Sequence, residues 1–137
     1  MKINSIEIEN FRSFYGIKKI DFSIDSIKNT TFIWALNNVG KTTILNSLTW
    51  CLHEEFTSSF KNPDQILNYQ AKKNGINSYS VKVQFSEEDK EYCAQRTGGR
   101  FPGFLVYEID ADGDHKPITS PILFMNTVLP KEMMKYF

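Results

Sequence analysis

Gly40, Lys41 and Thr42 have residue types and a spacing that suit phosphate binding. They close the stretch ALNNVGKT, residues 35–42, which is close to the general phosphate-loop pattern G-x-x-x-x-G-K-[ST]. Glycine at position 40 lets an anion approach the backbone, and the lysine supplies a mobile positive charge for the β- and γ-phosphates. The threonine offers a hydroxyl group to Mg²⁺. The stretch therefore predicts binding of a nucleotide with its magnesium ion.

Three residues of this stretch depart from the usual pattern. Ala35 replaces the first glycine and adds only a methyl group, whereas Asn38 is the next best choice to glycine where a left-handed backbone is needed. Leu36 is expected to pack on a neighbouring strand or on a partner. None of these changes removes the lysine or the hydroxyl group. The predicted nucleotide-binding residues are Asn37, Asn38, Val39, Gly40, Lys41, Thr42 and Thr43, with Thr42 as the magnesium ligand.

The elements on either side of the loop have to position it. TTFIW, residues 30–34, is a short β-branched and aromatic run that predicts a fully buried strand. After the loop the period becomes helical, which predicts a helix from Lys41 to about His53. Its apolar side is expected to consist of Ile44, Leu45, Leu48 and Leu52, with Cys51 beside them. The alternative is a strand, a turn and a helix that contain Gly-Lys-Thr by chance.

The remaining patterns predict further strands and short helices. Strand-like runs occupy 3–11 and 16–23, and three more occur around Val81–Phe85, at 91–96 and at 104–110, where polar turns favour an antiparallel sheet. DADGD, residues 110–114, is a turn signal. A helix is expected to begin near Pro63-Asp64 and to stop at Gly75. A short helix is expected within 117–129.

Bulk composition restricts the class of protein. The chain has 137 residues, enough for a single domain, and its 16 basic and 16 acidic residues give zero formal net charge. That balance excludes whole-molecule attraction to nucleic acid but leaves a local patch open. The two cysteines have no metal-like spacing, and the lack of a long apolar run or signal-like start favours a cytoplasmic protein with no membrane partner.

Together, MKINSIEIENFRSF, the second strand and TTFIWALNNVGKTTILNSLTWCLH resemble the N-terminal half of an ABC-type ATPase head. The group is that of the SMC proteins and related DNA repair ATPases within the AAA family. The resemblance implies an α/β P-loop NTPase fold, the N-terminal lobe of a head, with a mixed sheet and an antiparallel β part. In this group the NFRSF turn lies against the nucleotide, so Arg12 and Ser13 become further candidates. FRSFYG and LTWCLHEEFTSSF look closest to DndD-like ATPases.

Such a head is split, and its second half carries the signature motif and the Walker B carboxylates. After Lys41 the sequence has no apolar strand that ends in Asp-Glu and no heptads. The resemblance therefore implies a single-domain fragment, 1–137, with no catalytic residue of its own and little or no nucleotide affinity or ATPase activity alone. The parent is expected to bind ATP and Mg²⁺, to hydrolyse ATP and to act on DNA in repair, phosphorothioate modification or anti-phage defence. Its expected partners are the missing C-terminal half and a second head in a head-to-head dimer.

Two other functions remain open. One is a non-hydrolytic interaction module that keeps a degenerate P-loop, which the residues Ala35 and Leu36 motivate. The other is a small-nucleotide kinase, but no lid arginines or substrate-binding subdomain can be placed.

Several further residues have ordinary structural interpretations. Asp110, Asp112 and Asp114 favour a solvated hairpin turn over a calcium site, since the position of the twelfth EF-hand ligand is Pro121. His53 and His115 favour exposed or capping roles, and Arg96 and Arg100 favour a solvated strand end. Lys82, Lys90 and Arg96 are also candidates to face DNA. A missing half is expected to cover the late apolar residues, which are Ile122, Leu123, Val128, Leu129 and Phe137.

Overall fold

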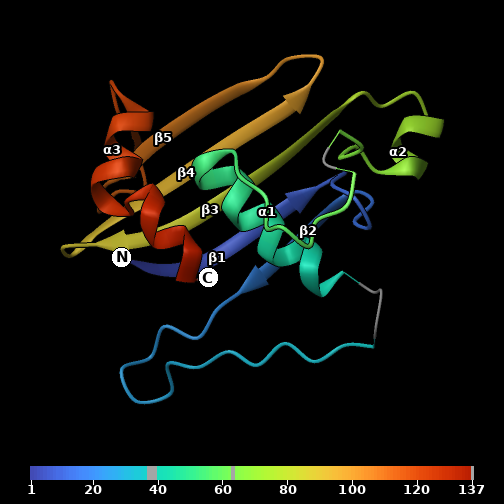
Figure 1. The fold of residues 1–137 in the computed structure, drawn as a ribbon. Helices are drawn as coiled ribbons and strands as arrows, with labels where there is room; N and C mark the ends of the chain where they lie inside the picture. The colour runs from blue at the N-terminus through green and yellow to red at the C-terminus, as the bar shows by residue number, and fades with distance from the viewer. Residues whose placement is uncertain (37–39, 63, 137) are drawn as a thin grey trace.

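A six-stranded sheet forms the centre of the chain in the computed structural model, which describes residues 1–36, 40–62 and 64–136. The strand order is β2-β1-β3-β4-β5-β6, and every described pair is antiparallel (Figure 1). The strand bounds are β1 Lys2–Glu9, β2 Ile17–Asp21, β3 Ser78–Glu87, β4 Lys90–Gly99, β5 Gly103–Ile109 and β6 His115–Pro117. These bounds confirm the strands expected from alternation, whereas β6 was not expected.

Helices cover one face of this sheet. α1, Lys41–His53, packs against β3 and β4, and α3, Pro121–Val128, packs beside it against β5 (Figure 1). α2, Tyr69–Lys73, lies beyond the strand ends, and a 3₁₀ helix, Lys131–Tyr136, follows α3. The α/β fold class with an antiparallel sheet is therefore confirmed. No helix among the described residues is long and apolar enough to cross a membrane.

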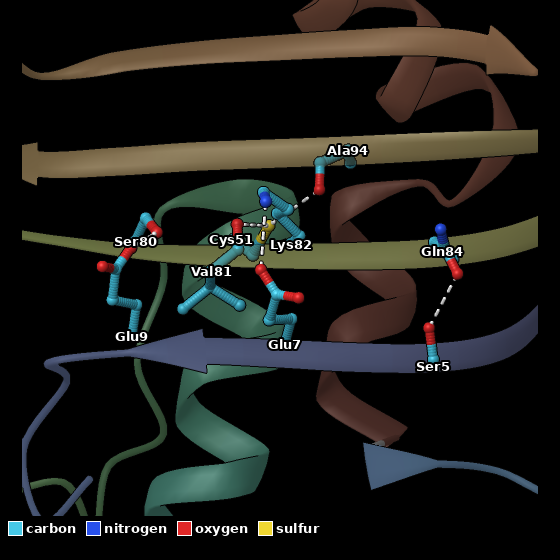
Figure 2. Close-up of polar contacts among 9 residues, drawn as sticks. All are labelled: Ser5, Glu7, Glu9, Cys51, Ser80, Val81, Lys82, Gln84 and Ala94. Atoms are coloured by element: carbon cyan, nitrogen blue, oxygen red, sulfur yellow. Dashed lines mark hydrogen bonds and ion pairs between the residues drawn. The ribbon is translucent and has the colours of Figure 1, made fainter. Parts of the chain in front are cut away.

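The two faces of the sheet differ because side chains alternate along each strand. On the helix side, the residues with no solvent exposure include Ile6, Ile8, Val81, Val83 and Phe85. On the other side, polar side chains pair across β1 and β3: Lys82 with Glu7 at 3.0 Å, Ser5 with Gln84 at 2.9 Å and Ser80 with Glu9 at 3.0 Å (Figure 2). The second face therefore carries paired polar groups, and the apolar core of the described residues lies on the helix side.

The expected strand at 30–34 is wrong. Residues 30–36 form no strand, and Phe32 and Trp34 are 84% and 76% exposed. In Figure 1 the segment that contains them extends away from the sheet before it returns to the start of α1. An apolar β-branched run forms a buried strand only where another strand pairs with it, and none of the described strands lies beside it. The expected mixed pairing is absent from the described part for the same reason.

Helix boundaries agree with the patterns only in part. α1 begins and ends as expected, but its fully buried residues include Trp50 and three polar residues, Asn46, Ser47 and Thr49, which the helical period did not identify. α2 begins at Tyr69 because the Asn68 side chain caps it by accepting from the backbone N–H of Ala71 at 3.1 Å. The expected start near Pro63-Asp64 is wrong, because residues 64–68 form no helix and Leu67 makes a β-bridge with Phe11. Pro63 itself lies outside the described residues.

Candidate functional site

The candidate nucleotide site begins where the loop enters α1. Gly40 has φ 111°, in the left-handed region that glycine adopts without strain. A Cβ atom at this position would lie 3.0 Å from Ser13 Oγ and 3.1 Å from the ring of Phe14. Gly40 is therefore required both by the backbone and by the turn that packs against it. Asn37, Asn38 and Val39 lie outside the described residues.

Lys41 and Thr42 are exposed in the first turn of α1. The Lys41 ammonium donates to the backbone carbonyl of Leu36 at 3.0 Å and also to that of Ala35. The first turn of α1 carries no acidic residue, so no side chain there opposes an anion at the positive end of the helix dipole. This arrangement suits a phosphate group, which would replace the two backbone carbonyls as the hydrogen-bond acceptor of the Lys41 ammonium.

The turn from Asn10 to Phe14 lies against the loop, and several bonds fix its shape. Asn10 and Arg12 both have positive φ, 51° and 52°. The Asn10 side chain accepts from the N–H of Gly16 at 2.9 Å, and the Asn68 side chain donates to the Arg12 carbonyl at 2.6 Å. The result is that exposed Ser13 is held beside Gly40, with its Oγ 3.5 Å from Thr43 Oγ1. The structure thus brings Ser13 together with Gly40–Thr43.

Arg12 has a different position. Its guanidinium donates at 3.0 Å to the carbonyls of Lys61 and Gln65, and it lies 4.6 Å from the ring centre of Phe60. Arg12 therefore fastens the segment before α2 to the turn. It also lines, with Ser13, a cavity of about 490 Å³ beside the loop, whose other walls include Gln65, Tyr69 and Lys72.

Asn46 was missed by the sequence patterns and supports the site from inside. It is fully buried, and its amide donates to the Thr42 carbonyl at 2.9 Å and to Thr57 Oγ1 at 3.1 Å. Its oxygen accepts from the N–H of Thr57 at 2.7 Å. Asn46 thus ties the first turn of α1 to the segment after α1. The only sequence signal was an asparagine in a helix interior, where it is unfavourable unless its side chain is bonded.

A cluster of three aromatic rings packs against the turn from Asn10 to Phe14. The ring centres of Phe11 and Trp50 are 5.3 Å apart, those of Trp50 and Tyr79 are 5.3 Å apart, and those of Phe11 and Tyr79 are 5.9 Å apart. Phe11 belongs to the turn, Trp50 to α1 and Tyr79 to β3. The cluster therefore fixes the turn against both the helix and the sheet. Periodicity alone did not predict it, because the three residues are distant in sequence.

The secondary candidates have structural roles. Asp110 accepts from the N–H groups of Asp112 and Asp114, each at 3.0 Å, as expected for a hairpin turn. No group of three or more metal-binding side chains occurs in the part of the chain that the structure describes. His53 is half-buried in the last turn of α1, and its Nε2 is buried without a hydrogen-bond partner among the described residues.

The basic residues proposed to face DNA are occupied elsewhere. Lys82 pairs with Glu7 at 3.0 Å, and Lys90 pairs with Glu108 at 3.1 Å. The expectation that Arg96 lies at a solvated strand end is wrong, because Arg96 is only 9% exposed and donates to the Cys51 carbonyl at 2.9 Å. Burial beneath α1 therefore removes Arg96 from the surface.

The apolar residues near the end of the chain differ in their solvent exposure. Ile122 and Leu123 on α3 are exposed, as expected for residues that another segment covers. Leu129 is buried, and Val128 is partly buried against the same core, so this chain already covers both. Phe137 lies outside the described residues.

Comparison with known proteins gives three similarities. A family model described as "AAA domain" matches residues 5–120. The chromosome partition protein Smc of Lactiplantibacillus plantarum is 32% identical over 92 residues, which cover 65% of this chain and 7% of that protein. An SMC head domain from Thermotoga maritima superposes with a TM-score of 0.48 and 19% identity, covering 86% of this chain and 39% of that chain. The chain thus spans less than a tenth of the Smc relative.

Proposed function

The chain belongs to the AAA domain family, and we propose that it is the ATP-binding lobe of an SMC-like ATPase head. One observation carries the proposal. Gly40, Lys41 and Thr42 begin α1, and the Ser13 turn packs against Gly40 so closely that a Cβ atom there would meet it. A glycine held this way, followed by an exposed lysine and threonine, leaves backbone and side-chain donors free to surround a phosphate.

Each residue of the loop has a proposed role. Lys41 exchanges the carbonyls of Ala35 and Leu36 for the β- and γ-phosphates of ATP. Asn37 to Thr43 are proposed to hold the phosphates through their backbone N–H groups, and Ser13 is proposed to contact the nucleotide from the turn. Arg12 positions this turn through the carbonyls of Lys61 and Gln65.

The donors at the start of α1 also fit Mg²⁺, which prefers oxygen ligands and retains several waters. The Thr42 hydroxyl is exposed there, next to the residues proposed to hold the phosphates. When bound, Mg²⁺ neutralises charge on the phosphate oxygens. Thr42 is the residue of this chain proposed to hold it.

A second lobe is proposed to complete the site. Hydrolysis requires a group that orients water and a carboxylate that helps to hold Mg²⁺, and the sequence after Lys41 supplies no Walker B pattern. The extended segment before the loop exposes Ile27, Phe32, Trp34 and Leu36. Apolar side chains gathered in this way are typical of an interface. We place a C-terminal lobe on this segment and on α3, and a second head across the loop.

A role linked to DNA is proposed for the protein that carries this lobe. The support is the similarity to a protein named for chromosome partition and the resemblance to repair and DndD-like ATPases. Repair, phosphorothioate modification and anti-phage defence are the candidate processes, in the cytoplasm. Because Lys82, Lys90 and Arg96 are paired with carboxylates, contact with the DNA phosphate backbone is assigned to other parts of the protein.

Phosphate release by the longer protein tests the proposed function. Lys41→Ala is expected to lower the rate by about 100-fold or more, the usual effect of removing a charged donor from a transition state. Lys73→Ala, on exposed α2, is the matched control and is expected to leave the rate unchanged. Equal rates in the two variants would favour the non-hydrolytic module, which the altered residues Ala35 and Leu36 motivate.

A further inference from the structure

We propose a second binding site, for a guanine base, in the cleft between the end of α1 and the β4–β5 strands. It lies at the opposite end of α1 from Lys41, about 20 Å away for a helix of this length. The loop residues take no part in it. The two sites have separate linings, although Trp50 and Tyr79 also belong to the aromatic cluster that contacts Phe11 of the turn.

The cleft has the size and the lining of a small-molecule site. Its volume is about 570 Å³, and such sites usually enclose about 300–1,000 Å³ between apolar and aromatic walls with a few polar groups. Four aromatic side chains line it, those of Trp50, Phe56, Tyr79 and Phe104. Two charged side chains, Glu54 and Arg96, share the same cleft. A flat ligand with polar edges suits these walls.

The aromatic walls are held in place before any ligand arrives. Trp50 is 4% exposed and contacts Tyr79 at 5.3 Å between ring centres. The Tyr79 ring lies directly on Gly98, where a Cβ atom would be 2.3 Å from it. Gly98 thus lets the ring lie flat along β4. A preformed aromatic surface loses little conformational entropy when a ring stacks on it.

The polar edge is also fixed. Arg96 donates from Nε to the Cys51 carbonyl at 2.9 Å and from Nη1 to Glu54 Oε2 at 3.2 Å, and its guanidinium lies 4.2 Å from the ring centre of Phe104. Burial lowers the Arg96 pKa, and the Glu54 charge opposes this change. The Glu54 side chain is 72% exposed, so its carboxylate retains room to accept further hydrogen bonds. The cleft therefore offers a donor and an acceptor side by side.

Guanine matches this pair better than the other bases. Its O6 and N7 atoms accept from an arginine, the commonest specific contact of arginine with a base. Its neighbouring N1–H and N2–H groups both donate to one carboxylate, whereas adenine and cytosine present a single amino group. Stacking of a base on an aromatic side chain is worth about 1–3 kcal/mol and occurs with every base. The walls thus supply affinity, and Glu54 with Arg96 supplies the preference.

Trp50 fluorescence of the 1–137 chain reports on the cleft. Trp34→Phe removes the other tryptophan, which is exposed outside the cleft. We expect guanosine monophosphate to quench this fluorescence in a saturable way. Its dissociation constant is expected to be at least tenfold lower than that of adenosine or cytidine monophosphate. Glu54→Gln is expected to weaken the binding of guanosine monophosphate at least tenfold. Glu91→Gln, at the exposed start of β4, is the control and is expected to change nothing.

Two further arms identify the source of the base and separate the site from the loop. A thymine single strand with one central guanine, compared with thymine alone and with duplex, distinguishes a strand from a free nucleotide. Tighter binding of the guanine strand assigns the cleft to unpaired nucleic acid, and tighter binding of the monophosphate assigns it to a free nucleotide. Lys41→Ala is expected to leave quenching unchanged even where it abolishes ATP binding. Absence of saturable quenching, equal affinity for all bases, or loss of quenching in Lys41→Ala would overturn the proposal.

Discussion

Ser13 Oγ lies 3.5 Å from Thr43 Oγ1, which joins the turn after β1 to the first turn of α1. Gly40 lies against the turn after β1, where a Cβ atom would be 3.0 Å from Ser13 Oγ and 3.1 Å from the Phe14 ring. Thirty residues separate Ser13 and Thr43 in the sequence, and the part of this segment that follows β2 extends away from the sheet. The contact therefore fixes the candidate phosphate site although the approach to the loop is not part of the sheet.

Gly40→Ala is expected to destabilise the chain and to abolish ATP binding. The alanine has to adopt φ near 111° while its Cβ meets Ser13 and Phe14, and strained positions of this kind cost about 1–3 kcal/mol each. Urea unfolding of the 1–137 chain measures this change. Gly113→Ala is the matched control, because its φ is 84° but no atom lies within 4 Å of a Cβ there. Equal losses in both variants would mean that the contact with the turn is unimportant.

Asn46→Ala is expected to lower the free energy of unfolding by about 2–3 kcal/mol. The change removes three hydrogen bonds that the buried amide makes to Thr42 and Thr57, and a hydrogen bond of this kind contributes about 0.5–1.5 kcal/mol. Thermal and urea unfolding of the chain give the value. Gln70→Ala is the control, because it removes an exposed amide that hydrogen-bonds the Asn74 side chain. It should change the free energy of unfolding by less than about 0.5 kcal/mol. A loss at Asn46 no larger than at Gln70 would contradict the structural role.

The stability of the chain is expected to fall as pH is lowered through the range where histidine titrates. Burial lowers the pKa of His53 below its usual 6.5. The polar backbone of nearby Leu129 and the Glu55 charge oppose this change, while the Lys131 and Arg96 charges add to it. The unfolded chain therefore binds the proton first. Stability is complete above pH 6.5 and is lost between that value and the lower folded pKa.

His53→Leu tests this pH dependence. The free energy of unfolding of this variant, measured with urea, should change less between pH 6.5 and 5 than that of the natural chain. The reason is that the variant lacks the titrating group. The carboxylates whose pKa is lowered, Asp25 and Asp110, titrate below about pH 4 and do not contribute in this window. His115→Leu, on the exposed edge strand β6, serves as the control and should keep the slope of the natural chain. An unchanged slope in His53→Leu would refute the assignment.

Much of the fold was predictable because local patterns determined it. Alternation of apolar and polar residues predicted β1 and β3, and strand-like runs between polar turns predicted β4 and β5. The change to a helical period after Gly40 predicted both ends of α1. The turn at Asp110 was predictable from residues that bond their own neighbours.

The errors came from interactions between distant residues. TTFIW has the composition of a buried strand, but burial depends on a neighbouring strand that the composition does not reveal. Arg96 was expected in solvent, yet the Cys51 carbonyl and Glu54 hold it beneath α1. Asn46 and the aromatic cluster of Phe11, Trp50 and Tyr79 support the site through contacts that have no sequence period.

The 1–137 chain alone is expected to show no appreciable ATPase activity. Lys41 and Thr42 are placed to bind phosphate and Mg²⁺, but stabilising a transition state also needs a fixed group that orients water in a closed site. Phosphate release from the purified chain is the measurement, with Lys41→Ala as the control for contaminating enzymes. A Lys41-dependent turnover near about 1 per second, the low end of ordinary enzyme rates, would show that a second lobe is unnecessary.

Equilibrium binding of labelled ATP to a protein that contains both proposed lobes tests the central claim most directly. The natural sequence, Lys41→Ala and the control Lys73→Ala are titrated in parallel with Mg²⁺ present. Loss of a charged hydrogen bond to phosphate, worth about 1.5–3 kcal/mol, predicts a roughly 10- to 100-fold weaker affinity for Lys41→Ala and no change for Lys73→Ala. The same affinity in all three proteins would contradict the claim that the loop at the start of α1 binds the nucleotide.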